Sequence, residues 1–211
     1  MSGFFANTKK PEGFGGKIMV AMMNHGHAAL SQWGRGFLHL NDGAHVLDLG
    51  CGGGANLAAL LDMYHGGIVT GLDYSPVSVE KAQKLNKQSI EAGRCQVAQG
   101  DVSALPFGES VFDLVTAFET VYFWPDLERS FHQVHRVLKP GGNFLICNEA
   151  DGTVTKQFKW CDLIDGMSIY TSGQLSALLR AAGFIHIGVH QEPQKHWLCV
   201  TAQKPESGET I

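Results

Sequence analysis

The sequence of 211 residues has no run of basic residues, no closely spaced cysteine pair and no long apolar stretch. Its 16 Lys and Arg are outnumbered by 20 Asp and Glu, which leaves a formal charge of −4. A protein that binds nucleic acid usually presents a track of Lys and Arg to the phosphates. We therefore expect no nucleic-acid partner.

The 5 cysteines include no Cys-x-x-Cys pair and are odd in number, so the sequence predicts neither a metal site nor a disulfide framework. The apolar stretch at residues 18–23 is too short to cross a bilayer. The first residues show no signal-peptide pattern. Together these absences lead us to expect a cytoplasmic protein without a membrane span.

The most informative segment is VLDLGCGGG at residues 46–54, where an apolar stretch runs into a glycine-rich turn. Residues 55–61 then read as the start of a helix. Glycines permit positive φ and let a ligand approach the backbone closely, and the helix N-terminus offers free N–H groups. The segment therefore predicts the first strand–turn–helix unit of a nucleotide-binding α/β domain.

Two classes of nucleotide fit this turn. Gly50-x-Gly52-x-x-Ala55 matches the dinucleotide fingerprint, which leaves a nicotinamide-dependent oxidoreductase as an alternative. Asp48, however, would repel a pyrophosphate and attract an amino group or a sulfonium. The sequence also lacks a Tyr-x-x-x-Lys pair. Asp48 therefore favours a cationic nucleoside without phosphate.

Two further carboxylates follow predicted strands. Asp73 ends residues 68–73 and lies about 20 residues past the turn, where a carboxylate binds ribose hydroxyls. Ser75 and Pro76 then read as the cap and first residue of a helix. Asp101 follows the predicted strand at residues 95–99, where it would accept from an adenine amino group or only cap a loop. Tyr74 would pack on the adenine or only cover the helix start.

The series VLDLGCGGG, GLDYS, QGDVSALPF, FDLVTAFETVYFWPD and RVLKPGG resembles the motifs of class I S-adenosylmethionine-dependent methyltransferases. The sequence looks most like the small-molecule branch related to the ubiquinone/menaquinone methyltransferases (type 11). The resemblance is strong over residues 44–148 and continues more weakly to about residue 204. It implies S-adenosylmethionine as cofactor and S-adenosylhomocysteine as product.

The resemblance also implies roles for single residues. It places the methionine part at Asp48 and residues 50–54, the ribose at Asp73, and the adenine at Asp101 and Val102. Cys51 is expected to be a small turn residue rather than a nucleophile. The residues expected to contact the cofactor are Asp48, Gly50, Cys51, Gly52, Gly54, Asp73, Tyr74, Ser75, Asp101, Val102 and Phe118.

Strand and helix patterns alternate along the chain, which predicts a mainly parallel sheet covered on both faces. We expect an α/β fold, a Rossmann-like seven-stranded sheet with an antiparallel last strand. The expected division is a single domain with an N-terminal helical lid at 1–43, a cofactor-binding core at 44–150, a substrate-side insertion at 151–171, and a helix and hairpin at 172–204. Expected strands are 45–49, 68–73, 95–99, 111–117, 143–148, 184–191 and 196–203; expected helices are 55–64, 76–92, 127–138 and 172–182, with one or two more within 17–40.

The acceptor pocket is expected between the N-terminal helices and the segment 149–171. Its aromatic and Met side chains suit a planar or lipophilic acceptor, although they could equally pack the lid. Catalytic candidates are His25 and Glu119, whereas His132 and His135 are expected in solvent. The substrate-binding candidates are Met23, Asn24, His25, Glu119, Tyr122 and Trp124, with Phe158, Trp160, Met167 and Tyr170 expected nearby.

The function expected from the sequence is methyl transfer to a small molecule by in-line displacement, in which the protein mainly aligns the reactants and excludes water. A general base is needed only if the acceptor carries a proton that must leave. Two alternatives stay open beside it: a non-catalytic protein that binds S-adenosylmethionine, and a protein or nucleic-acid methyltransferase. The sequence does not identify the acceptor atom or the oligomeric state.

Overall fold

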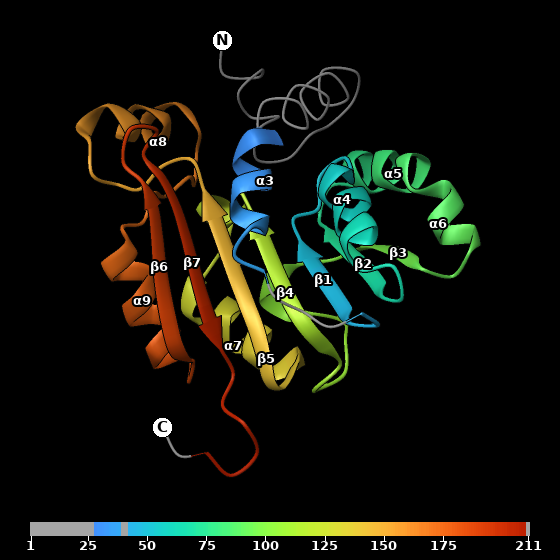
Figure 1. The fold of residues 1–211 in the computed structure, drawn as a ribbon. Coiled ribbons are helices and arrows are strands. Elements are labelled where there is room, and N and C mark those ends of the chain that lie inside the picture. The colour runs from blue at the N-terminus through green and yellow to red at the C-terminus, as the bar shows by residue number, and fades with distance from the viewer. Residues whose placement is uncertain (1–27, 39–41, 210–211) are drawn as a thin grey trace.

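The computed structural model describes residues 28–38 and 42–209. These residues form a central seven-stranded sheet with the strand order β3-β2-β1-β4-β5-β7-β6 (Figure 1). Only β7 runs antiparallel to its neighbours, so the predicted fold class is confirmed. The strands are β1 (His45–Leu49), β2 (Ile68–Asp73), β3 (Cys95–Gln99), β4 (Phe112–Phe118), β5 (Leu138–Asn148), β6 (Ile185–Glu192) and β7 (Trp197–Gln203).

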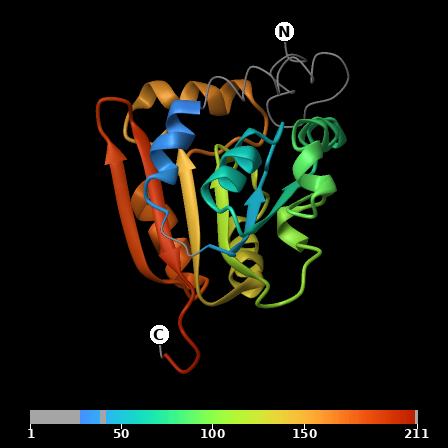
Figure 2. The ribbon, with the colours of Figure 1, turned by 45° about the vertical axis from the view of Figure 1, so that its right-hand side comes forward.

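Helices cover both faces of the sheet. In both views α3 and α4 lie on one face, while α7 and α9 lie on the other (Figures 1 and 2). The α-helices are α3 (Ala28–Arg35), α4 (Ala55–Met63), α5 (Pro76–Leu85), α6 (Lys87–Glu91), α7 (Leu127–Val137), α8 (Lys159–Leu163) and α9 (Ser172–Ala181). Short 3-10 turns are η1 (Val102–Ala104), η2 (Val121–Phe123) and η3 (Thr155–Phe158).

The central strand β1 explains both the core and the position of the site. Val46, Leu47 and Leu49 are fully buried because helices pack on both faces of the strand. The chain adds β2 and β3 on one side of β1 and then crosses to β4 on the other side. The carboxyl ends of β1 and β4 therefore border a topological switch point, where ligands of open α/β sheets bind.

The expected helix 76–92 is wrong as a single element. Ser75 caps α5 and Pro76 begins it, as predicted, but the helix ends at Leu85. Asn86 separates α5 from α6, because its side-chain amide donates to the carbonyl oxygens of Gly54 and Ala82, both at 3.0 Å. An Asn side chain that bonds to the backbone competes with the regular helical ladder.

The start of strand β5 also differs from the expectation. Strand β5 begins at Leu138 rather than near residue 143, because Leu138 already pairs with Phe112 before the register shifts. Gly141, with φ of 76°, lies in this irregular first part of the strand. Helix α9 is capped by Thr171, which forms a capping box with Gln174.

His135 was expected in solvent, and this is wrong. Its ring packs edge-on against Phe184 at 5.1 Å between centroids, and its Nε2 is buried without a hydrogen bond. Burial lowers the pKa of His135, and Lys204 and His132 lower it further. His132 is exposed, as expected. The part of α7 that carries His135 thus packs toward α9 and Phe184 instead of facing solvent.

Within 28–38 and 42–209, no helix is long and apolar enough to cross a membrane. The expected candidates Met23, Asn24 and His25 lie outside the described residues. Of the expected N-terminal helices the structure describes α3, which ends at Arg35, one residue after Gly34.

Candidate functional site

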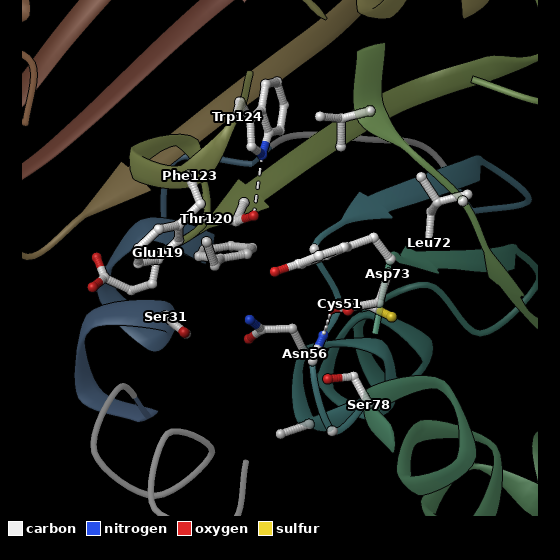
Figure 3. A pocket seen from close by; sticks show the side chains of 18 of the residues that line it. Ser31, Cys51, Asn56, Leu72, Asp73, Ser78, Glu119, Thr120, Phe123 and Trp124 are labelled. Carbon is white, nitrogen blue, oxygen red and sulfur yellow. Dashed lines mark hydrogen bonds between the residues drawn. The ribbon is translucent and has the colours of Figure 1, made fainter. Parts of the chain in front are cut away.

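A cavity of about 580 Å³ lies at the carboxyl ends of the parallel strands, between α3, α4 and η2 (Figure 3). This volume lies within the range of small-molecule and cofactor sites. Its walls combine the glycine turn, three carboxylates and several aromatic rings. The described lining residues are Ala28, Ser31, Arg35, Gly50, Cys51, Gly52, Gly53, Ala55, Asn56, Ala59, Leu72, Asp73, Tyr74, Ser78, Gly100, Asp101, Val102, Phe118, Glu119, Thr120, Phe123, Trp124, Pro125 and Gly166.

The glycine turn forms the floor of the cavity. The N–H groups of Gly50 and Cys51 both donate to the carbonyl oxygen of Leu72, at 2.8 and 3.1 Å. Gly50 has φ of 72°, and a Cβ on this residue would collide with the side chain of Thr120. Only glycine fits both the backbone angle and the close approach. The turn therefore brings bare backbone to the cavity surface.

Cys51 lines the cavity, but its thiol is buried. Burial raises the pKa of Cys51 well above its usual range, and the nearby Asp73 and Asp48 raise it further. A thiol that stays protonated is a poor nucleophile. The structure thus agrees with a turn residue here.

Gly54 does not line the cavity. Its φ is 83°, and a Cβ there would collide with the side chain of Asn86 and with Ala82. The conformation belongs to the first residue before α4, where it lets α5 approach closely. Gly54 therefore supports the turn from the side that packs against α5. The direct cofactor contact that the sequence predicts for Gly54 would need it to line the cavity, and it does not.

Asp73 reaches the cavity from the end of β2 and also organises its surroundings. One carboxylate oxygen accepts from the N–H of Gly52 and the other from the N–H of Ser75, both at 2.9 Å. Burial raises the pKa of Asp73, while the bonds from Ser75 and Gly52 lower it. Ser75 itself is fully buried and caps α5 instead of lining the cavity.

Asp48 lies beneath the cavity rather than on its surface. Its side chain is 1% exposed and accepts from the Thr116 hydroxyl at 2.7 Å. Burial raises the pKa of Asp48 to about 7; the Thr116 bond and the charge of Arg35 lower it, whereas Asp73 raises it. The carboxyl group is thus placed to act on a ligand through its field and to change charge near neutral pH.

Arg35 is a cavity residue that the sequence interpretation missed. It lies in the last turn of α3 and donates to the Asn56 side chain, in the first turn of α4, at 2.8 Å. Burial lowers the pKa of Arg35, while Asp48 and Cys147 raise it. Arg35 is the one basic side chain among the described cavity residues. Nothing in its local sequence pattern marks it, because α3 and the glycine turn meet only through folding.

The cavity extends from Arg35 to the ends of β2 and β3. There it is lined by Tyr74, which follows β2, and by Asp101 and Val102, which follow β3. Tyr74 lines the cavity and remains 38% exposed. Asp101 caps η1 by accepting from the N–H and the hydroxyl of Ser103, both at 2.8 Å. The two roles considered for Asp101, loop cap and ligand contact, are thus compatible in this geometry.

Glu119 follows β4 in a left-handed conformation, with φ of 59°. Such a backbone costs a non-glycine residue roughly 1–2 kcal/mol. The residue is held there because its N–H donates to the Cys147 carbonyl at 2.9 Å and its carboxylate accepts from the N–H of Glu149. Burial raises the pKa of Glu119 well above its usual range, and the charge of Glu149 raises it further.

Some of the aromatic residues that the sequence places near the ligands line the cavity, and others do not. Trp124 lines it and donates from Nε1 to the Thr120 hydroxyl at 3.1 Å. Phe118 and Phe123 line it as well. Tyr122 instead points into a small core beneath, where its hydroxyl accepts from the N–H of Ala150 at 2.9 Å.

The segment 151–171 contributes less to the cavity than expected. Of its described residues only Gly166 lines the cavity. Phe158 and Trp160 are exposed, whereas Met167 and Tyr170 pack against apolar clusters. Across the described chain, no three His, Cys, Asp or Glu side chains are grouped to hold a metal ion.

The fold and the site define an open α/β domain with a ligand cavity at the carboxyl ends of its parallel strands. Residues 47–146 match the family model described as a methyltransferase domain. This part of the chain is similar to the class I S-adenosylmethionine-dependent methyltransferases, and the resemblance inferred from its motifs is confirmed. The demethylmenaquinone methyltransferase of Lactiplantibacillus plantarum is 38% identical over 113 residues, which are 53% of this chain and 47% of that protein. The chain thus spans about half the length of this relative.

Solved structures share the fold at low sequence identity. A chain from the complex between the Haloferax volcanii Trm112 methyltransferase activator and a putative methyltransferase has a TM-score of 0.83 at 21% identity, covering 98% of this chain and 99% of that one. A Haemonchus contortus phosphoethanolamine N-methyltransferase, solved with phosphomonomethylethanolamine and S-adenosylhomocysteine, has a TM-score of 0.79 at 18% identity. The alignment covers 98% of this chain and 61% of that one.

Proposed function

We propose that this protein transfers the methyl group of S-adenosylmethionine to a small-molecule acceptor. The observation that carries the proposal is the distribution of charge along the cavity, with Asp73 and Asp101 at one end and Arg35 beside the start of α4. A nucleoside with an amino-acid tail presents ribose hydroxyls at one end and a carboxylate at the other. The match of residues 47–146 to the methyltransferase family supports this cofactor.

In this proposal Asp73 accepts from the ribose hydroxyls, and Asp101, Val102 and Tyr74 contact the adenine. Arg35 and the free N–H groups at the start of α4 bind the methionine carboxylate. Asp48, buried beneath the turn, stabilises the positively charged amino group through its field. Gly50 and Gly52 allow the cofactor to lie directly on the backbone.

When bound, the cofactor supplies an electrophilic methyl group on a sulfonium that is already a good leaving group. The chain then has to hold the acceptor in line with that methyl group and keep water out. Phe118, Phe123 and Trp124 provide an apolar wall for the acceptor. Their rings also favour a nearby cation such as a sulfonium.

The names of the relatives do not identify one acceptor. By their names, one acts on demethylmenaquinone and another on phosphoethanolamine. We favour a small acceptor over a nucleic acid, because Arg35 is the one basic side chain among the described cavity residues. We also place the protein in the cytoplasm, which agrees with its 5 free cysteines.

The test is calorimetric titration with S-adenosylmethionine, S-adenosylhomocysteine and NADH. The proposal predicts saturable binding of the first two ligands and none of NADH. Binding of NADH alone would replace the proposal with the oxidoreductase alternative. Saturable binding without transfer of a labelled methyl group to any acceptor pool would point to the non-catalytic alternative.

A further inference from the structure

The segment that follows β5 exposes a group of apolar side chains at the cavity end of the sheet. It contains η3 and α8, which run on from one another over residues 155–163. Figures 1 and 2 show α8 beyond the carboxyl ends of the parallel strands. Trp160 is 48% exposed and Leu163 is 55% exposed, and Phe158 beside them is exposed too. A single exposed apolar residue needs no explanation, whereas a group of them marks a surface that contacts a partner.

Helical spacing places two lysines on the same face as these side chains. Lys156 and Lys159 are three residues apart across η3, and side chains at this spacing eclipse in a 3-10 turn. Lys159 and Leu163 are four residues apart, and Trp160 and Leu163 are three apart, so they are neighbours on α8. All four side chains are exposed. We call these four residues the α8 face.

The opposite side of α8 is anchored in the protein. Cys161 packs against the apolar cluster that contains Tyr122, and Ile164 at the end of the helix is buried. Gly166, three residues after Leu163, lines the cavity. The α8 face therefore belongs to a helix that is packed on the domain and lies next to the cavity wall.

We infer that the α8 face binds the surface of a lipid bilayer with anionic headgroups. Trp and Leu beside Lys on one helix face are typical of helices that lie in the interface between water and acyl chains. Lys156 and Lys159 meet the anionic headgroups, while Trp160 and Leu163 enter the acyl boundary. A chain bound in this way holds the neighbouring end of the cavity close to the lipid surface.

The acidic residues beside the face limit the electrostatic part of this binding. Asp162 and Asp165 are exposed and close in sequence to the α8 face. They offset part of the attraction of Lys156 and Lys159 for anionic headgroups. Contact of the apolar side chains with the acyl boundary therefore supplies most of the affinity.

The size of the face favours a lipid surface over a protein partner. A stable protein interface takes about 20–30 residues on each side. In contrast, η3 has 4 residues and α8 has 5. Other exposed large apolar side chains, such as Leu85 and Val189, belong to α5 and β6 and do not extend the face. A symmetric contact between two copies would also bring the same two lysines toward each other.

Vesicle flotation tests the inference with the whole chain. The probes are vesicles of phosphatidylcholine alone and of phosphatidylcholine mixed with phosphatidylglycerol, and we expect tighter binding to the mixed vesicles. Leu163→Ser should weaken that binding about 10-fold, because it removes an inserted apolar side chain. The matched control is Leu85→Ser, since Leu85 is also 55% exposed but lies on α5. It should change binding less than about 2-fold.

A variant that combines Lys156→Gln and Lys159→Gln tests the role of charge. It should weaken binding to the mixed vesicles about 5-fold and change binding to phosphatidylcholine alone less than about 2-fold. A loss of the same size on both kinds of vesicle would contradict the role given to the two lysines.

Fluorescence quenching tests whether this face is the one that inserts. The chain has 4 Trp, and lipids with brominated acyl chains quench those that reach the acyl boundary. The unchanged chain should be quenched, and Trp160→Phe, which keeps an aromatic ring, should bind the vesicles with most of the quenching lost.

The inference is overturned if the unchanged chain does not bind vesicles, if Leu163→Ser and Leu85→Ser lose equally, or if quenching persists in Trp160→Phe. A dimer in sedimentation that depends on Leu163, without vesicle binding, would assign the α8 face to a second copy of the chain. Titration with S-adenosylmethionine should give the same affinity for the unchanged chain and the α8 variants. Failure of that titration in the unchanged chain would remove the proposed function and leave the vesicle result standing.

Discussion

The Arg35 guanidinium donates to the Asn56 side chain at 2.8 Å and so joins the end of α3 to the first turn of α4. The bond fixes a cation beside the N-terminus of a helix, at the edge of the cavity. Both groups attract an anion.

Arg35→Gln should weaken binding of S-adenosylmethionine and S-adenosylhomocysteine about 10- to 100-fold, because it removes a charge-assisted bond to the carboxylate. Binding of 5′-methylthioadenosine, which has no carboxylate, should change less than about 3-fold. Calorimetric titration measures all three ligands. Arg180→Gln, an exposed Arg on α9, is the matched control. Equal losses for all three ligands would contradict the assignment.

Asp73→Asn should lower both cofactor affinity and stability, because the Asp73 carboxylate accepts from Gly52 and Ser75. An amide offers one acceptor oxygen where the carboxylate offers two. We expect a loss of about 1–3 kcal/mol in the free energy of unfolding. Urea unfolding and calorimetric titration measure the two effects.

Asp101→Asn serves as the comparison for Asp73, since Asp101 is exposed and accepts hydrogen bonds from Ser103. It should lower adenine affinity with a stability change below about 1 kcal/mol. If Asp101→Asn proved the more destabilising variant, the structural role given to Asp73 would be wrong.

Asp48 should make the free energy of unfolding fall as pH rises from about 4 to about 7. Its pKa is about 7 in the folded protein and near 3.8 when unfolded. The folded state therefore binds more protons in this range, and stability declines as pH rises through it, then levels above about 7. Asp48→Asn should remove this decline, so that the variant gains stability relative to the unchanged protein at pH 8 but not at pH 4. Urea unfolding at both pH values measures the difference.

The same carboxyl group should couple cofactor binding to proton release. A bound ammonium group lowers the pKa of Asp48, so binding near pH 7 should release a fraction of a proton. Titrations in buffers of different ionisation enthalpy measure that release. Asp48→Asn should show less release, and an unchanged value would place the cofactor's amino group outside the field of Asp48.

Gly50→Ala and Gly52→Ala form a matched pair in the glycine turn. Both residues have positive φ, 72° and 52°, so each substitution introduces backbone strain of about 1 kcal/mol. A Cβ at Gly50 also collides with Thr120, whereas at Gly52 it meets nothing within 4 Å. We expect Gly50→Ala to lose a further 1–3 kcal/mol, roughly, of unfolding free energy. Thermal unfolding compares the two variants, and equal losses would show that the Thr120 contact relaxes freely.

Much of this architecture was predictable because it depends on short-range patterns. Apolar stretches that end in Asp48 and Asp73 placed both residues at strand ends, and Ser75 with Pro76 marked the start of α5 correctly. The wrong helix 76–92 has a long-range cause, since the Asn86 side chain bonds to Gly54 across 32 positions of sequence. The burial of His135 likewise depends on Phe184, which a sequence pattern on α7 alone does not reveal.

The sequence by itself determined the order of strands and helices, the glycine turn and the edge of the sheet at which the acids gather. These follow from periodicity, from turn chemistry and from the common direction of parallel strands. Only the tertiary structure decided which side chains reach the cavity. Asp48 proved to lie beneath it and Arg35 on its wall, and Glu119 gained its left-handed backbone and its buried carboxyl from contacts with β5 and η2. Burial, close packing and the resulting shifts in pKa depend on residues distant in sequence, and only the folded chain brings them together.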